Sequence, residues 1–205
     1  AKVKLISKQI NTISSFDNSA LSKVKSTSRK DFKNVTNRTI EQTMEVLPAG
    51  TRRLAAQLTT VLDFDSLWEV LTNYNKLSEF IPNLFSSEVI SRTENEVHIK
   101  QVGSQEFLGL NFSAEVLINL IEDKPNGILT FTLIKGDFRR FEGSWRISHS
   151  SVENRRSLTY ELIVQGCFGM PVSLIEKHLR KNLKTNLLAV EKAAFELSCQ
   201  DKNLV

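Results

Sequence analysis

The sequence lacks any long apolar run. Its longest unbroken apolar stretches, such as Val116-Leu117-Ile118, are only a few residues long, whereas a helix needs roughly 20 apolar residues to cross a bilayer. Cysteine is also scarce, since Cys167 and Cys199 are the only two and their spacing suits neither a metal site nor a disulfide framework. We therefore expect no transmembrane segment, no metal site, no cofactor and a reducing compartment.

Acidic residues are rare in the first 40 positions. Nine Lys/Arg there face only Asp17 and Asp31, a net charge of +7, whereas the whole chain carries +4, so the remaining residues carry −3. A nucleic-acid-binding core should display its own basic face. The mildly acidic remainder therefore argues against specific nucleic-acid binding by the domain.

Residues 1–38 also lack apolar periodicity. They are rich in Ser, Lys, Asn and Thr, and Phe16 and Phe32 are their only aromatic residues. Such a segment cannot bury enough apolar surface to offset its chain entropy, so we predict a tail that is disordered on its own. Its composition is also typical of organelle transit peptides. The predicted domain spans 39–199, followed by a short tail at 200–205.

Alternation of apolar and polar residues predicts a strand that ends near Leu62, preceded by a turn at Pro48–Gly50. Phe64, Leu67, Trp68 and Leu71 then share one helical face, and Asp63 or Asp65 can cap that helix. A second short helix carries Leu77, Phe80 and Ile81 and ends at Pro82.

A series of strands follows from Leu84 to Gln165. Short turns such as Lys124–Gly127 join them, which indicates an antiparallel meander. The alternation of Val97, Ile99 and Gln101 slips at Val102-Gly103, and we expect a bulge there. The predicted inward sets are Phe112, Ala114, Val116, Ile118 and Leu120; Leu129, Phe131 and Leu133; Phe141, Gly143, Trp145 and Ile147; and Leu158, Tyr160, Leu162 and Val164.

The last predicted element is a long helix with Pro171 near its first turn. A single apolar stripe with steps of three or four residues runs along it, through Leu174, Ile175, Leu179, Leu183, Leu187, Val190, Ala194 and Leu197. The opposite face is basic. A helix with this pattern must lie across a sheet.

This order of elements, and several short motifs, resemble a known superfamily. Leu67–Tyr74 followed by Leu77–Leu84 is similar to the signature of the polyketide cyclase/dehydrase and coenzyme Q-binding branch of the START-related (SRPBCC, Bet v-like) proteins; Gln101–Gly103, Gly136–Phe138 and Phe141–Trp145 look like its sheet motifs. The resemblance implies an α+β helix-grip fold, in which a curved antiparallel β-sheet wraps around a long C-terminal α-helix, with two short helices after the first long strand. In particular, the sequence resembles the cyclase/dehydrase-like proteins of cyanobacteria and plastids, which implies the cytoplasm of a cyanobacterium or the plastid stroma.

A helix laid across a curved sheet need not fill the space beneath it. The residues expected to line that space are mostly aromatic, and an apolar lining with few polar tips suits a lipophilic ligand. The same side chains would serve equally as an ordinary core. The candidate ligand-binding residues are Phe80, Phe107, Phe112, Phe131, Phe141, Trp145, Tyr160, Leu162, Phe168, Met170, Leu174 and His178.

The sequence gives catalysis no positive support. Glu115, Glu142 and Glu161 fall on outward positions, and inward acids are scarce by alternation. His178 borders the apolar stripe and is the one candidate for an acid or base, whereas Arg139 shares parity with Phe141 and could orient a polar head group or form a rim ion pair.

Three functions therefore remain open. The first is binding, transport or chaperoning of an apolar molecule such as an isoprenoid quinone, carotenoid or lipid. The second is a cyclase or dehydratase acting on a hydrophobic substrate. The third is docking of the basic tail, residues 1–38, onto an acidic partner in a larger assembly, photosynthetic or ribosomal. Peripheral contact with a membrane is compatible with each.

Overall fold

A computed structural model describes residues 40–107, 110–152, 154–167 and 172–201, apart from the side chains of 105–107, 110–112, 172–175, 177 and 201. The predicted tail 1–38 and the residues Phe168, Met170 and Pro171 lie outside the described ranges. No helix in the described part of the chain is both long enough and apolar enough to cross a membrane.

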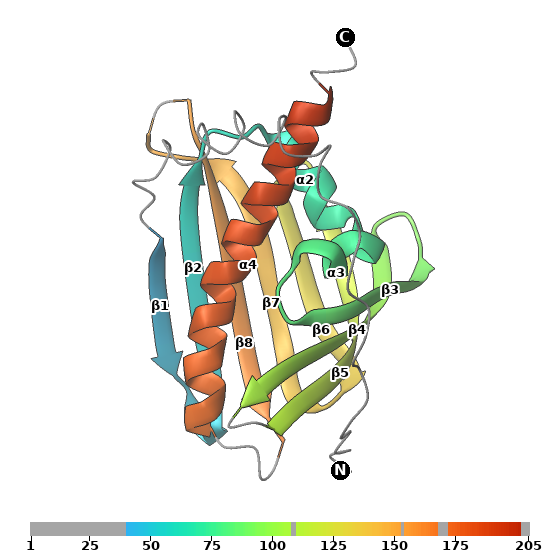
Figure 1. The fold of residues 1–205 in the computed structure, drawn as a ribbon, viewed down its shortest axis with the longest axis vertical. Coiled ribbons are helices and arrows are strands. Elements are labelled where there is room, and N and C mark those ends of the chain that lie inside the picture. Colours follow the sequence, from blue (N-terminus) through green and yellow to red (C-terminus); the bar gives the residue numbers. More distant parts are fainter. Residues whose placement is uncertain (1–39, 108–109, 153, 168–171, 202–205) are drawn as a thin grey trace, which may run out of the picture.

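An antiparallel hairpin and two short helices open the fold. Strands β1 (Glu41–Val46) and β2 (Arg52–Thr60) pair across the 3-10 turn η1 (Pro48–Gly50), as predicted. Helix α2 (Phe64–Thr72) follows, then the 3-10 turn η2 (Tyr74–Lys76) and the short helix α3 (Leu77–Phe80). These helices sit on the concave side of the sheet (Figure 1).

Asp63 caps α2, which decides between the two residues predicted for this role. Its carboxylate accepts a hydrogen bond of 2.8 Å from the Ser66 amide. That hydrogen bond stabilises the charged form and lowers the pKa of Asp63 below its usual range.

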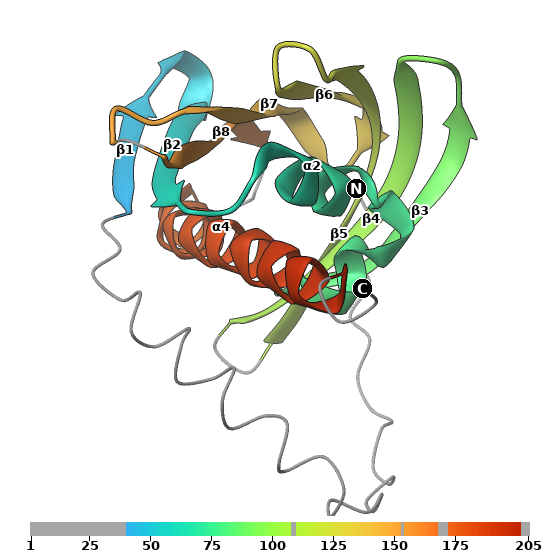
Figure 2. The ribbon, with the colours of Figure 1, turned by 90° about the horizontal axis from the view of Figure 1, so that it is seen from above.

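Six consecutive strands then form the predicted meander. They are β3 (Leu84–Arg92), β4 (Glu96–Phe107), β5 (Leu110–Asp123), β6 (Ile128–Gly136), β7 (Phe138–His149) and β8 (Arg156–Gly166). Strand β8 pairs with β2, so the order across the sheet is β1-β2-β8-β7-β6-β5-β4-β3. The sheet curves around α2 and α4, as Figure 2 shows.

Helix α4 (Val172–Asp201) crosses the concave face and packs against β2, β8 and α2. Its predicted stripe is buried at Leu183, Leu187, Val190 and Ala194. This combination of a curved antiparallel sheet and a long C-terminal helix is the helix-grip architecture (Figure 1).

The bulge predicted at Val102-Gly103 is wrong for β4 itself. The pairing of β4 with β5 runs without a shift through both residues. The irregularity lies on the opposite strand, where β3 steps from Leu84, opposite Gly103, to Ser86, opposite Val102. Phe85 is therefore the extra residue, and it is 78% exposed. Gly103 thus indicated the correct position in the sheet, but the bulge lies on β3 and not on β4.

Candidate ligand-binding site

The concave face has a closed end and an open end. At the closed end, where β7 leads into β8 and α2 covers the sheet, Leu58, Ile147 and Leu158 are almost completely buried. Toward the open end, where β6 turns into β7, the inward side chains of Leu133, Phe141 and Trp145 are only half-buried. The inward side chains over this part of β6 and β7 therefore keep more accessible surface than those at the closed end.

A continuous row of rings crosses this more accessible area. We call Trp145, Tyr160, Phe131, Phe141 and Phe138 the aromatic row. Trp145 and Tyr160 are paired across β7 and β8 and stack with ring centroids 4.1 Å apart at 4°. Successive centroids then lie 6.2 Å apart from Tyr160 to Phe131, 5.6 Å from Phe131 to Phe141 and 5.4 Å from Phe141 to Phe138.

Gly143 gives the row its shape. It faces inward between Phe141 and Trp145, opposite Phe131 on β6. A Cβ atom at this position would lie 2.6 Å from Cζ of Phe131 and 2.0 Å from the backbone oxygen of Glu161. Only a residue without a side chain lets the Phe131 ring lie over β7, so Gly143 keeps the row continuous.

Phe138 was not predicted as part of the site. The register between β7 and β8 shifts between Phe138 and Arg140, so Arg139 is an extra residue in β7. This bulge reverses the side-chain alternation, which places Phe138 against Phe141 and leaves Arg139 exposed. The prediction that Arg139 shares the inward side of Phe141 is therefore wrong.

Other predicted site residues are divided between the core and the undescribed parts. Leu162 is buried beneath α4, Phe80 is half-buried on α3, and His178 is half-buried on α4. Phe168 and Met170 lie outside the described ranges, and so do the side chains of Phe107, Phe112 and Leu174. Their part in a site stays a prediction.

Inward-facing polar side chains also occur on β2 and β4. On β2, the half-buried Arg52 faces inward next to Leu54 and forms an ion pair with Glu176 in the first turns of α4. On β4, Gln101 donates a 3.2 Å hydrogen bond to Ser87 of β3. Within the described ranges, no cluster of three or more His, Cys, Asp or Glu residues is placed to hold a metal ion.

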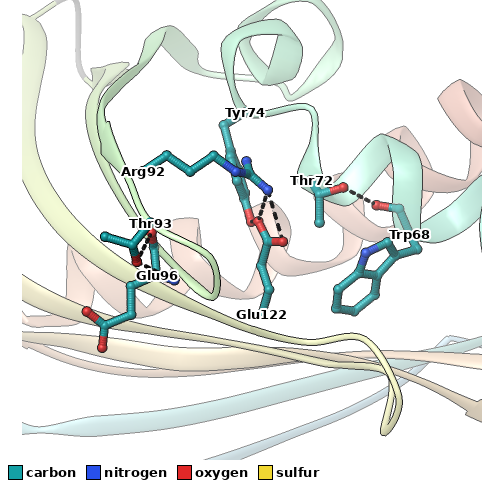
Figure 3. Close-up of polar contacts among 7 residues, drawn as sticks. All are labelled: Trp68, Thr72, Tyr74, Arg92, Thr93, Glu96 and Glu122. Atoms are coloured by element: carbon teal, nitrogen blue, oxygen red, sulfur yellow. Dashed lines mark hydrogen bonds and ion pairs between the residues drawn. The ribbon is translucent and has the colours of Figure 1, made fainter.

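One inward-facing acid escaped the prediction from alternation. Glu122 shares the inward side of Leu120 near the end of β5, and its side chain is only 14% exposed. Its carboxylate accepts hydrogen bonds of 2.7 Å from the Tyr74 hydroxyl and of 2.8 and 3.0 Å from Arg92 (Figure 3). We call Tyr74, Arg92 and Glu122 the closed-end cluster. Its partners lie on η2 and β3, so the cluster ties the short helices to the sheet.

Comparison with known proteins gives the family. The sequence model for polyketide cyclase / dehydrase and lipid transport proteins matches residues 62–191, and the chain belongs to this family. A search of curated proteins found no match.

Solved structures show the same fold at low sequence identity. A STAR-related lipid transfer protein from Xanthomonas axonopodis superimposes with a TM-score of 0.63 at 14% identity, over 76% of this chain and 93% of that one. Human StAR-related lipid transfer protein 5 gives 0.63 at 8%, over 83% and 94%. The Zhui aromatase/cyclase from a Streptomyces gives 0.56 at 13%, over 70% and 91%. The fold is thus consistent with binding of a hydrophobic ligand.

Proposed function

We propose that this protein binds an apolar small molecule on the concave face of its sheet, beside α4 and over β6 and β7. The observation that carries this proposal is the aromatic row, whose members Phe138, Phe141 and Trp145 keep accessible surface although they face inward. Inward-facing rings that retain such surface can bury it against a ligand, at about 25 cal/mol for each Å² removed from water.

The family narrows the candidate ligands. Two of the similar structures bear lipid-transfer names and a third bears an aromatase/cyclase name. Isoprenoid quinones, carotenoids and lipids combine an apolar body with few polar atoms, which suits the composition of the row. We place these classes first among the ligands to test, with binding, transport or chaperoning as the role.

Binding has more support in the geometry than proton transfer. A cyclase or dehydratase needs an acid or base that faces the substrate with a proton site to spare. Glu122 is an inward acid, but its carboxylate already accepts from Tyr74 and Arg92. The geometry therefore assigns this acid to holding the fold together.

Native mass spectrometry of gently purified protein tests the proposal directly. We expect a population carrying a lipophile of defined mass that organic solvent removes. A protein that is free of any lipophile, and that takes up neither an isoprenoid quinone nor a fatty acid when these are added, would contradict the proposal.

The two tryptophans provide a matched pair of reporters. Trp145 belongs to the aromatic row, whereas Trp68 is buried in α2 and stacks on Phe64 with centroids 5.7 Å apart. In a Trp68→Phe variant, a short-chain ubiquinone should quench the remaining fluorescence of Trp145 with saturation. In a Trp145→Phe variant the same quinone should quench Trp68 far less. Equal and unsaturable quenching in both would indicate collisions in solution and count against the site.

Docking through residues 1–38 stays a separate prediction, because these residues lie outside the described ranges. The excess of nine Lys/Arg over two Asp in residues 1–40 motivates it. Pull-downs with and without this segment, at two salt concentrations, test it. An electrostatic tail should lose its partner as salt rises, and retention by the truncated protein would exclude this role.

A further inference from the structure

The stacked pair at one end of the aromatic row carries polar atoms without partners. Tyr160 is 7% exposed, and its hydroxyl makes no hydrogen bond with any of the described residues and is not fully buried. The indole N–H of Trp145 is likewise without a hydrogen-bond partner in the described part of the chain, and this ring is half-buried. Buried tyrosine and tryptophan normally find a partner for their polar atom.

The sequence around Tyr160 explains why no protein group reaches its hydroxyl. Its cross-strand neighbours on the inward face are Ala56 on β2, which is too short and apolar, and Trp145 on β7, which stacks flat against it. Phe131, the next ring, is apolar as well. None of these three neighbours therefore offers an acceptor.

We propose that Tyr160 is a specificity-determining residue, whose hydroxyl donates a hydrogen bond to an acceptor oxygen of the bound molecule while Trp145 presents its indole edge beside it. This inference rests on the proposed function and narrows it. The ligand combines a flat or chain-like apolar body with an acceptor such as a carbonyl oxygen, and a pure hydrocarbon of the same shape binds less well.

The protonation state of Tyr160 suits this role. Burial raises the pKa of Tyr160 above its ordinary value, because the phenolate would be poorly solvated. The hydroxyl therefore keeps its proton throughout the neutral pH range and remains a donor. An unpaired donor discriminates strongly, since a ligand without an acceptor leaves it buried and unsatisfied.

Two probes of matched shape isolate the hydrogen bond. 2-Methyl-1,4-naphthoquinone carries two carbonyl oxygens, and 2-methylnaphthalene carries none. Equilibrium dialysis of both against the full chain, with each probe quantified by its ultraviolet absorbance, gives the ratio of their dissociation constants. We expect the wild type to prefer the quinone, and Tyr160→Phe to lower that preference about twofold to tenfold, the range for loss of one neutral hydrogen bond.

Tyr74→Phe is the control. Tyr74 is the other buried tyrosine, and its hydroxyl is already engaged by Glu122. This variant should keep the wild-type preference for the quinone even if its stability falls. A preference that survives Tyr160→Phe unchanged, or that falls equally in Tyr74→Phe, would overturn the role of Tyr160 and leave apolar binding intact. Failure of the wild type to bind either probe would overturn both the role and the proposed function.

Discussion

The closed-end cluster and the aromatic row each contain one buried tyrosine, but the two hydroxyls have opposite surroundings. Tyr74 is 2% exposed and donates to Glu122, whereas Tyr160 is 7% exposed and has no hydrogen-bond partner in the described residues. A hydroxyl that donates a hydrogen bond to another side chain helps to hold the fold. A hydroxyl without a partner in the protein can instead donate to a ligand. The comparison therefore separates a structural tie from the recognition site that we propose on the same sheet face.

Gly143→Ala should produce the largest change, because it distorts the aromatic row and leaves the closed-end cluster intact. The added Cβ would meet a backbone oxygen at 2.0 Å, which cannot be relieved by rotating a side chain. We expect a loss of about 3 kcal/mol or more in the free energy of unfolding. Urea denaturation measures it, with Ser144→Ala, on the opposite face of β7, as the control. A near-neutral Gly143→Ala would contradict the close approach of Phe131 to β7.

Glu122→Ala should damage the closed-end cluster and spare the aromatic row. The change leaves the Tyr74 hydroxyl buried without an acceptor and removes the hydrogen bonds from Arg92, so we expect a cost of about 2 kcal/mol. Thermal unfolding monitors the loss, and the Trp145 quenching titration in the Trp68→Phe background should show unchanged quinone affinity. A large loss of affinity with little loss of stability would place Glu122 in the binding site instead.

The matched pair Tyr74→Phe and Tyr160→Phe tests the comparison directly. Removing the Tyr74 hydroxyl breaks a buried hydrogen bond to a carboxylate and should cost about 1.5 kcal/mol. Removing the Tyr160 hydroxyl deletes a group that has no hydrogen-bond partner among the described residues and should cost close to nothing. Chemical denaturation at neutral pH, with ligand extracted first, measures both. Equal costs would mean that the Tyr160 hydroxyl has a partner in the free protein.

Alkaline pH should give a graded effect. Burial raises the pKa of both tyrosines, and the hydrogen bond to Glu122 adds to the rise for Tyr74. The unfolded chain therefore releases these protons near pH 10 while the folded protein holds them. The associated stability is complete below pH 10 and is lost as the pH rises above it.

The urea midpoint of the wild type should accordingly be lower at pH 11 than at pH 9. The fall should be smaller in Tyr74→Phe and in Tyr160→Phe, each of which removes one of the two groups. If the urea midpoint of a variant falls as much as that of the wild type, the tyrosine that this variant lacks ionises normally in the folded wild-type protein.

Most of the architecture was predictable because alternation and helical spacing report burial directly. The hairpin, the two short helices, the meander and the stripe of α4 all follow from runs of apolar residues whose spacing reveals one buried face. The Trp145–Tyr160 pairing needed in addition the register between β7 and β8, which the inward sets of both strands imply but do not fix.

The errors have a common physical cause. Bulges insert one residue and thereby reverse which face the following side chains occupy. This explains why Phe138 and not Arg139 faces inward, and why the residue beside Val102-Gly103 that interrupts the ladder is Phe85 on the neighbouring strand. Glu122 escaped notice for a different reason. It lies near the end of the apolar strand β5, at a position whose side chain the alternation directs inward. Its partners Tyr74 and Arg92 are distant in sequence, so no local pattern indicates them.

The interruption at Phe85 also affects how molecules meet one another. Strand β3 is an edge strand of the sheet. An edge strand with free amide and carbonyl groups is a template with which a strand of another molecule can pair. Two register shifts, between Leu84 and Ser86 and between Val89 and Ser91, break the regular spacing of those groups. An incoming strand cannot follow such a ladder for more than a few residues. The irregular edge strand thus disfavours fibrillar self-association. A variant whose β3 pairs with β4 in a regular register should show more thioflavin T-positive aggregation on mild heating.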